Sequence, residues 1–424
     1  MHEPTTSAPP CYPPRVAPAA DSVRPQRNVL TSHDDATLGM AMRRLNSLLS
    51  MKALLAVRNL KSSGGRLWVS LFGIAFATSL MAVQGSLLHS FTQAASRIVD
   101  SVDADIWIVG KGTPTFDYVS PIPERYAYLA LGVDGVRDSG RGIAGWAPMQ
   151  RPNGDRMLVM LIGVESAYRG RLPAVAELAA TAGLSDSALV IDASDARTLG
   201  FDGTPRIAQV AARRGHFLSA TSGFASFLGS PLVFTDYIDA HRFMRFERTQ
   251  TSFIVLRLEP GHDASAVRDV LRARLPDVDV WRTGEFSLQS RIFWLTQTGA
   301  GGALSVAAIL GFGIGLVLVA QTIYGITAEN IEEYATMKAM GASNRDVRSV
   351  VLTQSLVCGV IGGVFGLLVV EPFASVLRFS VSWMAVPYWM YFIVAGALAL
   401  LCVLASLIAA QPAVRVDPGR VFRA

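Results

Sequence analysis

The segment ENIEEYATMKAMGASNRDVRS, residues Glu329–Ser349, is charged and helix-forming, and it lies between two long apolar runs. The run before it, residues 292–328, contains no Asp, Glu, Lys or Arg, and the run after it covers residues 350–370. A membrane-spanning helix needs roughly 20 consecutive, predominantly apolar residues. Both runs are long enough, so the charged segment is predicted to connect two membrane spans.

Two further apolar runs complete the pattern, because residues 67–88 and 379–414 also carry no formal charge. The first of them lies too far from the N-terminus to be a cleaved signal peptide. With 51% hydrophobic and only 17% charged residues, the composition is typical of a membrane protein that also has a water-facing part. We therefore expect four transmembrane helices, over residues 67–89, 291–327, 350–371 and 388–411.

The Lys and Arg residues predict how these helices are oriented, since loops on the cytoplasmic side carry an excess of both. Basic residues are frequent before the first span and after the fourth, whereas the loop at 372–387 carries only Arg378. Both termini, including the tail 412–424, are therefore predicted to be cytoplasmic. The same holds for the charged segment with its flanking residue, 328–349, which is called the coupling segment below. Residues 90–290 and the short loop 372–387 then lie outside, on the opposite side of the membrane.

The chain before the first span divides into two parts. Residues 1–38 are rich in Pro, Ala, Ser and Thr and are predicted to be a disordered tail. An alternative is that translation begins at Met40, Met42 or Met51. In residues 39–66, leucines fall near one helical face among scattered basic residues: Leu45, Leu48, Leu49 and Leu55. This pattern predicts an interfacial amphipathic helix along the cytoplasmic leaflet; the alternative is a solvated helix that leads into the span.

Residues 90–290 have the patterns of a globular α+β domain. Pro-Asn-Gly-Asp at 152–155 is a turn signal between the strand-like runs 142–150 and 156–163. Further on, a β-rich run at 251–258 is followed by a helical pattern and by another strand-like run at 278–281, which indicates a split βαβ arrangement. The predicted fold class is an α-helical membrane protein with four transmembrane helices and an extracytoplasmic α+β domain inserted between helices 1 and 2.

This outer region contains no recognisable catalytic or metal-binding motif. Its histidines occur singly, and its paired charges are expected to be solvated: Asp103 and Asp105, Asp192 and Asp195, Arg213 and Arg214. The stretch Gly-Lys-Gly-Thr at 110–113 lacks the spacing of a phosphate-binding loop and is predicted to be a turn. Cys11 lies in the tail, whereas Cys358 and Cys402 lie in apolar runs and are predicted to be small buried hydrophobes.

We therefore predict no catalytic residue, no metal site and no cofactor in this chain. A basic and aromatic pattern that would indicate nucleic acid is also missing from the sequence.

The charged segment itself is predicted to be a helix, a tight turn and a second helix. Glu329–Met340 contains good helix formers and neither Gly nor Pro. Gly341 is suited to the left-handed conformation at a helix end. Ser343 and Asp346 have the spacing of a helix start. A stiff helix joined without slack to two spans can transmit force, although a loop that only connects two helices is the alternative.

The sequence also resembles a known family. The stretch TIYGITAENIEEYATMKAMGAS, Thr322–Ser343, resembles the exit of the second span in permease subunits of the MacB/FtsX superfamily of ABC transporters. The first span, GIAFATSLMAVQ at Gly73–Gln84, is similar to that of DevC-type permeases. The family pattern in the coupling segment is a Glu, a small or apolar stretch, a basic residue and a Gly-Ala turn. In this chain it falls on Glu333, Tyr334, Lys338, Gly341, Ala342 and Ser343.

The resemblance implies a mechanism and a set of partners. A separate cytoplasmic ABC ATPase would bind ATP and Mg²⁺ and would dock onto the coupling segment, since this chain lacks a GxxxxGK[ST] loop. The permease would form a dimer, homo- or heterodimeric, and relay motion across the membrane to its outer domain, a process called mechanotransmission. With a periplasmic adaptor and membrane lipids as further partners, it would export a lipid, glycolipid or other hydrophobic compound.

Two other functions stay open at this point. The same relay could serve a cell-wall hydrolase or the release of lipoproteins. The chain could also be a membrane enzyme or sensor whose site lies in the outer domain.

Overall fold

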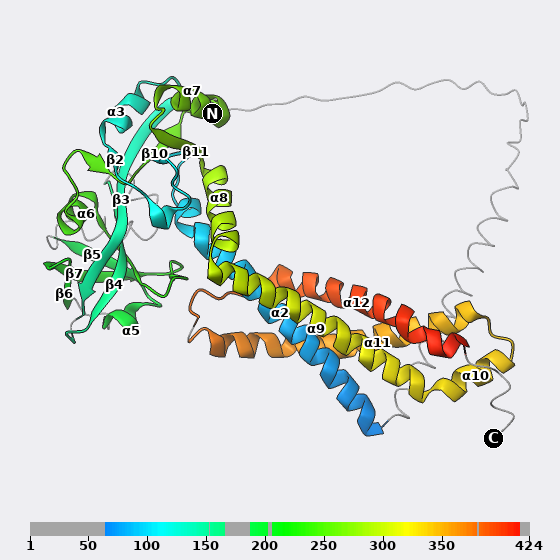
Figure 1. Ribbon diagram of the computed structural model, residues 1–424. Coiled ribbons are helices and arrows are strands. Elements are labelled where there is room, and N and C mark those ends of the chain that lie inside the picture. Colours follow the sequence, from blue (N-terminus) through cyan, green and yellow to red (C-terminus); the bar gives the residue numbers. More distant parts are fainter. Residues whose placement is uncertain (1–63, 152, 166–186, 202–205, 380, 416–424) are drawn as a thin grey trace, which may run out of the picture. The chain divides into compact units, whose positions relative to one another are not determined.

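The computed structural model describes residues 64–151, 153–165, 187–201, 206–379 and 381–415 (Figure 1). The predicted tail 1–38, the interfacial helix up to residue 63, Cys11 and the last residues of the C-terminal tail lie outside the described residues.

Four long helices in the described chain are apolar enough to cross a membrane, as judged by length and composition. Their bounds are α2 Gly64–Ser101, α9 Gly299–Glu329, α11 Asn344–Leu377 and α12 Tyr388–Arg415. The predicted four long apolar helices are therefore present in the described chain. In the chain, a domain with a β-sheet and several helices lies between α2 and α9.

Helix α2 is longer than predicted. It continues past residue 89 to Ser101, so the residues predicted to open the outer domain, 90–101, are helical and continuous with the first apolar helix. The physical reason is that the last turns of α2 remain apolar on one side. Ile98 and Val99 of these turns are buried in a hydrophobic cluster with sheet residues such as Trp107. Burial of this face stabilises the helix beyond the length that a membrane requires.

The predicted second span, residues 291–327, is two helices in the structure. Helix α8, Thr283–Thr296, ends shortly before α9 begins at Gly299. Thr298 separates them as the N-cap of α9, because its Oγ1 accepts a hydrogen bond from the backbone N–H of Gly301 at 3.1 Å. The two helices approach closely here, since a Cβ atom at Gly301 would lie 2.0 Å from the carbonyl oxygen of Trp294. The continuous apolar run hid this break.

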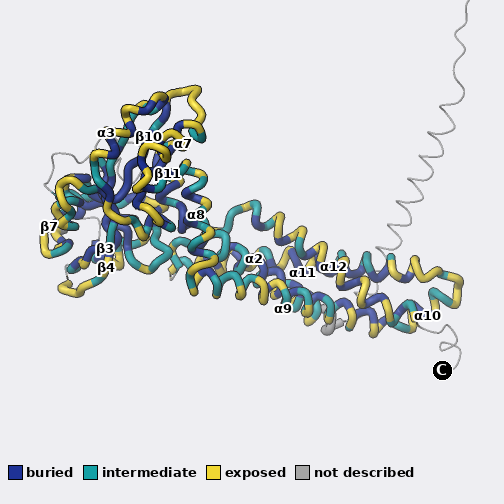
Figure 2. The backbone as a smooth tube through the Cα atoms, turned by 45° about the horizontal axis from the view of Figure 1, so that its top comes forward, coloured by how far each residue is buried: buried dark blue, intermediate teal, exposed yellow. Residues whose placement is uncertain are grey.

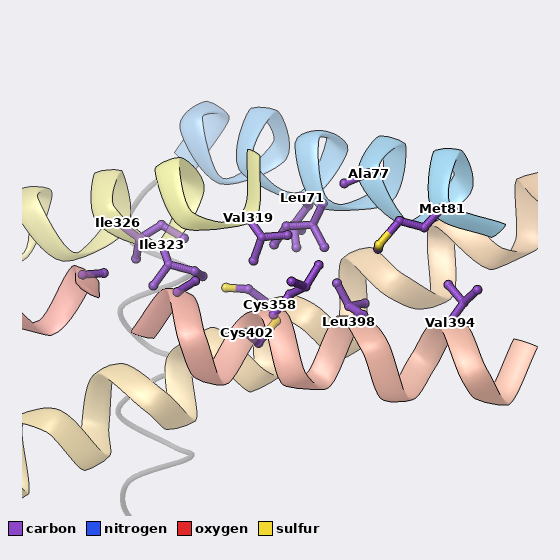
Figure 3. Close-up of a cluster of buried hydrophobic side chains, with 14 of the residues drawn as sticks. Leu71, Ala77, Met81, Val319, Ile323, Ile326, Cys358, Val394, Leu398 and Cys402 are labelled. Carbon is purple, nitrogen blue, oxygen red and sulfur yellow. The ribbon is translucent and has the colours of Figure 1, made fainter. Parts of the chain in front are cut away.

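Small residues let the four apolar helices pack closely. A Cβ atom at Gly366 of α11 would lie 2.5 Å from the carbonyl oxygen of Ala75 in α2, and one at Gly359 would lie 2.5 Å from the sulfur of Cys402 in α12. Close approach at small residues is a common way for membrane helices to associate. Cys358 and Cys402 are buried as predicted, and Figure 3 shows Cys358 pointing into the same space as Leu71 and Val319.

The outer domain is built on a mixed sheet whose strand order, in the described chain, is β11-β1-β10-β3-β4-β8-β5-β7-β6. Its strands are β1 Ile106–Gly110, β3 Val136–Gln150, β4 Arg156–Val164, β5 Ala188–Asp192, β6 Arg206–Val210, β7 Arg213–Thr221, β8 Leu232–Asp236, β10 Phe253–Leu258 and β11 Val278–Arg282. Strands β2 Ile122–Pro123 and β9 Gln250–Thr251 form a separate small pair. The remaining elements are η1 Phe116–Tyr118, α3 Arg125–Leu131, α5 Ala196–Leu199, α6 Tyr237–Met244 and α7 Ala264–Arg274. Figure 2 shows that buried residues concentrate in this sheet and along the inner sides of the long helices.

Both local predictions for this domain are confirmed. Strands β3 and β4 form an antiparallel hairpin in which Gln150 pairs with Arg156 on either side of the predicted turn. Strands β10 and β11 are connected through α7, and both pair antiparallel with β1, which lies between them. This is the split βαβ arrangement. The Gly-Lys-Gly-Thr stretch is a turn, closed by a hydrogen bond from the Thr113 N–H to the Gly110 carbonyl at 3.1 Å.

Candidate functional site

The coupling segment forms a separate short helix, α10, Ile331–Ala339. The prediction of one helix over Glu329–Met340 is wrong at its start, because α9 extends to Glu329 and the chain leaves the helical conformation at Asn330. Asn330 is buried, and its side-chain amide donates to the Ile326 carbonyl at 2.8 Å. Asn side chains compete with helical backbone bonds in this way. Asn330 therefore sets the change of direction between α9 and α10.

The turn after α10 is closed by a Schellman motif. Gly341 has the positive φ of +96° that the sequence predicts. Its N–H donates to the Lys338 carbonyl, and the N–H of Ala342 donates to the Met337 carbonyl, both at 3.0 Å. These two bonds are the signature of the motif. The helix end is thus tied down by backbone bonds, with no flexible linker.

The next helix begins immediately, as predicted. Ser343 is the N-cap of α11, and it forms a capping box with Asp346. The Ser343 hydroxyl lies 2.7 Å from the Asp346 carboxylate, which also accepts from the Ser343 backbone N–H at 3.1 Å. The carboxylate lies in the first turn, where the helix dipole favours a negative charge. Ala342, the last residue of the Schellman motif, is followed directly by Ser343, the first residue of the capping box.

The inner side of α10 is fastened to two other helices. Tyr334 is buried, and its hydroxyl donates to Oε1 of Gln354 in α11 at 2.6 Å. The Lys338 ammonium donates to the backbone carbonyl of Val414, near the end of α12, at 2.8 Å. Because α10 also follows α9 directly, it is connected to α9, α11 and α12. A displacement of α10 would therefore act on three of the four apolar helices.

The six predicted site residues fall into two groups. Glu333, Gly341 and Ser343 are exposed, Ala342 is half-buried, and Tyr334 and Lys338 lie on the inner side as anchors. The structure adds Met340, which is 77% exposed at the end of α10. A large apolar side chain exposed beside charged residues is suited to binding a protein partner. The sequence signal for this residue is a methionine directly before the turn glycine, at a position that was not predicted to belong to the site.

At the other end of the spans, aromatic side chains from four parts of the chain meet. We call this cluster the outer joint and define it as Phe91 of α2, Asp117 of η1, Phe227, Trp294 of α8, and Trp383 of the α11–α12 loop. The Trp294 and Phe227 ring centroids are 4.8 Å apart and perpendicular, and the centroids of Phe91 lie 5.3 Å from Phe227 and 6.1 Å from Trp383. Such edge-to-face pairs each contribute about 0.5–1.5 kcal/mol beyond burial.

Polar bonds complete the outer joint. The buried Trp294 donates its indole N–H to the Asp117 carboxylate at 3.0 Å. Burial raises the pKa of Asp117 to about 6, although the bonds from Trp294 and Thr115 oppose that rise. The Ser90 hydroxyl of α2 donates to the Ala385 carbonyl at 2.9 Å. The outer joint therefore connects α2, α8 and the α11–α12 loop to the sheet domain.

Helices α2 and α8 are also joined to each other by a charged contact. The Arg291 guanidinium donates to the Ser96 hydroxyl at 2.7 Å and to the Asp100 carboxylate at 2.8 Å. Both acceptors lie on the part of α2 that was expected to belong to the outer domain. The two helices thus enter the sheet domain as a bound pair (Figure 1).

Charged residues in the sheet domain are more paired than the sequence suggested. The expectation that Asp192 is solvated is wrong: it is buried, and it accepts bonds from the backbone N–H groups of Ser194 at 2.9 Å and Phe224 at 2.6 Å. These donors hold the carboxylate away from water. Asp103 forms an ion pair with Arg257 at 2.6 Å.

One polar network was missed altogether. Arg141 of β3 binds Glu165 at 2.5 Å and Glu124 at 3.1 Å, and Glu124 also accepts from the Tyr237 hydroxyl of α6. Burial alone would raise the pKa of Glu165, but the bonds and charge of Arg141 lower it below its ordinary value. The partners are far apart in sequence, so no local pattern could reveal them. Because Arg141 bridges the two carboxylates, the network is suited to holding α3 and α6 against the sheet.

Comparison with known proteins gives matches in both parts of the chain. Residues 305–418 match the family described as FtsX-like permease C-terminal. An uncharacterized ABC transporter permease of Mycobacterium tuberculosis, present in strains CDC 1551 and H37Rv, is 25% identical over 120 residues. That match covers 28% of this chain and 34% of the relative, so it spans about a third of the relative's length.

Two solved structures are similar to part of the chain. The periplasmic region of MacB from Actinobacillus actinomycetemcomitans has a TM-score of 0.34 at 9% identity, covering 44% of this chain and 92% of that one. The extracellular domain of the noncanonic ABC-type transporter YknZ from Gram-positive bacteria has a TM-score of 0.30 at 12% identity, covering 42% and 98%.

Proposed function

We propose that this chain, whose residues 305–418 form an FtsX-like permease domain, is the membrane subunit of an ABC-type export system. In this role it relays the ATP-driven motion of a separate ATPase to its own sheet domain. The observation that carries the proposal is the fastening of α10 to three apolar helices, through Asn330, through Tyr334 with Gln354, and through Lys338 with Val414.

The coupling segment meets the mechanical requirement of a relay. A lever must move as one body, and the four residues between α10 and α11, Met340–Ser343, are held by the Schellman motif and by the capping box. The outer side of α10 remains available to a partner, since Glu333 and Met340 are exposed. An ATPase dimer that closes on ATP would displace this side, and the buried anchors would pass the displacement to the spans.

Helix α2 supports the onward step to the sheet domain. Its 38 residues give a length of about 57 Å at 1.5 Å per residue, whereas the hydrocarbon core of a membrane is roughly 30 Å thick. The helix therefore extends well past the span, and its far end is buried in the domain core through Ile98 and Val99. Tilting of α2 would then move the sheet domain directly.

The remaining parts of the proposal follow from this role. The chain would lie in a bacterial inner membrane with both termini cytoplasmic, would pair with a second permease copy, and would contact a periplasmic adaptor. The likeness of Gly73–Gln84 to DevC-type permeases favours a lipid, glycolipid or other hydrophobic compound as the exported substrate. Hydrolysis of ATP would belong to the partner subunit.

The proposal is tested by purifying the full chain in detergent from its native host and identifying the proteins that accompany it. We expect an ABC ATPase, and Met340→Asp should reduce its recovery about tenfold, because burial of a Met side chain contributes roughly 1.5–3 kcal/mol. The matched control is Ile238→Asp, the same type of change at an exposed side chain of α6.

The identity of the proteins that accompany the chain decides between outcomes. An ATPase recovered together with a periplasmic adaptor supports export. A cell-wall hydrolase in place of the adaptor would redirect the relay to that enzyme. Absence of any ATPase from the wild-type preparation would contradict the proposed function.

A further inference from the structure

A pocket of about 560 Å³ lies beside the outer joint, between the sheet domain and the α11–α12 loop. Its walls come from three segments: the end of β5 with α5, the loop before β8, and the loop after α11. The side chains that matter to its chemistry are Arg197, Ser226, Phe227, Arg378, Phe379 and Trp383. Neither the coupling segment nor the relay described above uses this space.

The polar part of the lining offers donors. Arg197 is exposed, and its guanidinium has no ion-pair or hydrogen-bond partner among the described residues; only its backbone carbonyl accepts a bond, from Gly200. The Ser226 oxygen accepts from the Leu228 N–H at 3.2 Å, which leaves its own hydrogen available to donate. Arg378 forms an ion pair with Glu371 at 2.9 Å and donates from Nε to the Met384 carbonyl at 3.3 Å, so part of its five N–H donors is already used. These groups favour an anion, as guanidinium groups commonly do.

One carboxylate, Asp195, also lines the pocket. Its Oδ2 atom is buried and has no hydrogen-bond partner among the described residues. Burial, and then the charge of Asp192, raise the pKa of Asp195 to about 6. Oδ2 of Asp195 is therefore turned away from a ligand, and Arg378 is paired with Glu371, so the exposed Arg197 guanidinium is the main positive charge that a ligand would meet.

The other part of the lining is aromatic. Phe227 and Trp383 belong to the outer joint, and Phe379 is 83% exposed just after α11 ends. Phe379 and Trp383 follow a membrane-spanning helix, at the level where aromatic side chains commonly contact the boundary between lipid and water. A ligand held here would have access both to the donors above and to the outer leaflet below.

We propose that this pocket binds the anionic head group of an amphiphile from the outer leaflet, with the apolar chain lying against Phe379 and Trp383. The head group would be a phosphate or a carboxylate, held by Arg197, Ser226 and the outward side of Arg378. Binding of the amphiphile to the pocket is independent of the proposed function, whereas its assignment to the outer leaflet rests on the proposed orientation. A role for the ligand as exported substrate or as regulator of the outer joint rests on that function.

The test uses the full chain in phosphatidylcholine nanodiscs, without any ATPase, so a failure here is separate from a failure of the export proposal. Titration with lysophosphatidylglycerol, followed by native mass spectrometry, should give saturable binding of one molecule per chain. Arg197→Gln should weaken that binding about tenfold, because a hydrogen bond to a charged group is lost. The matched control, Arg214→Gln, changes an exposed arginine of β7 outside the pocket and should leave the affinity unchanged.

Three further probes separate the possible sources of binding. Phe379→Ala should weaken lysophosphatidylglycerol binding and leave competition by inorganic phosphate unchanged. If inorganic phosphate alone competes as effectively as the lysolipid, the site binds free anions and the amphiphile proposal is wrong. If an uncharged monoacylglycerol binds equally well, or if Arg197→Gln and Arg214→Gln behave alike, the head-group role is contradicted.

Discussion

The two ends of the spans are built in different ways. The coupling segment is held by a few defined polar bonds, such as those of Tyr334 and Lys338, and its outer side is open. The outer joint is a buried cluster of rings around Trp294, closed by the bond to Asp117. This difference indicates two tasks. The inner end is suited to repeated contact with a partner, and the outer end to a permanent connection between spans and sheet domain.

This comparison assumes that the coupling segment and the outer joint lie on opposite sides of the membrane. Labelling of single cysteines tests that assumption, and its result is all-or-none. In a variant whose native cysteines are alanine, Asn153→Cys in the β3–β4 turn should react with an impermeant maleimide added to the periplasmic side. Ser343→Cys at the start of α11 should react only after the cells are opened. Both positions are exposed, so accessibility alone does not separate them. Reversed labelling would place the coupling segment outside and end the relay proposal.

The largest graded effect should come from the outer joint. Trp294→Ala removes a buried ring that contacts Phe91 and Phe227, and truncation of a buried aromatic residue costs about 3–5 kcal/mol. We expect a marked fall in the unfolding temperature of the full chain in detergent. Trp294→Phe, which keeps a ring but loses the bond to Asp117, should cost only about 1 kcal/mol. Equal stability of the alanine variant and the wild type would show that the joint is not a structural connection.

A second, smaller effect should come from the turn of the coupling segment. Gly341→Pro is incompatible with a φ of +96° and removes the N–H that bonds to Lys338. It should cost about 3 kcal/mol locally, shifting α10 while the spans remain inserted. The measurement is stimulation of the co-purified ATPase by the permease, which should be lost, with membrane insertion followed by the labelling above. Gly154→Pro, also at a positive φ but in the outer hairpin, is the matched control and should leave stimulation unchanged.

The sequence predicted the inner end far better than the outer end, for a physical reason. Gly341, Ser343 and Asp346 act on their own immediate neighbours, so their conformation is encoded locally. The apolar runs likewise reveal spans, because a membrane imposes the same requirement on every residue of a run. What local patterns missed were interruptions: α9 begins at its N-cap Thr298 inside an apolar run that reads as continuous, and Asn330 interrupts the helix expected from Glu329 onward.

The long-range contacts that connect the site to the rest of the chain could not be predicted from the sequence. Trp294 and Asp117 are 177 residues apart, and Lys338 and Val414 are 76 apart. Their partnership depends on how the helices and sheet pack, and a single sequence carries no signal for such pairs. Tyr334 and Lys338 were identified as site residues by resemblance, but their role as buried anchors rather than as contact residues required the structure.

The pH dependence of the outer joint gives a third, moderate effect. Since burial raises the pKa of Asp117 to about 6, the folded protein holds this proton more tightly than the unfolded chain does. Stability contributed by the group is therefore present below the ordinary aspartate pKa near 4 and is lost as pH rises through about 6. Asp117→Asn cannot ionise but can still accept from Trp294. It should raise the unfolding temperature at pH 7.5 and have little effect at pH 4, with a gain on the order of 2 kcal/mol.

Asp277→Asn, at an exposed position before β11, is the control for this measurement and should change neither value. A fall in stability of Asp117→Asn at pH 7.5 would mean that the charge itself holds the joint. The outer end would then depend on an ionic bond, as the inner end does on polar ones, and the contrast between them would weaken.

The smallest effects should come from the two anchors of α10, and they sharpen the comparison most. Tyr334→Phe removes only the hydroxyl that bonds to Gln354, and Lys338→Met removes only the ammonium that bonds to Val414. Each bond contributes about 1 kcal/mol to stability, so the unfolding temperature should barely move.

If α10 is the lever, however, both variants should reduce stimulation of the ATPase by several-fold, because the force then reaches fewer helices. Lys338→Met should loosen α10 from α12, which cross-linking between α12 and α10 would detect as a loss of proximity. If stimulation is unchanged in both variants, the polar anchors are not needed for the relay. Force would then pass only through the backbone that joins α10 to α9 and to α11.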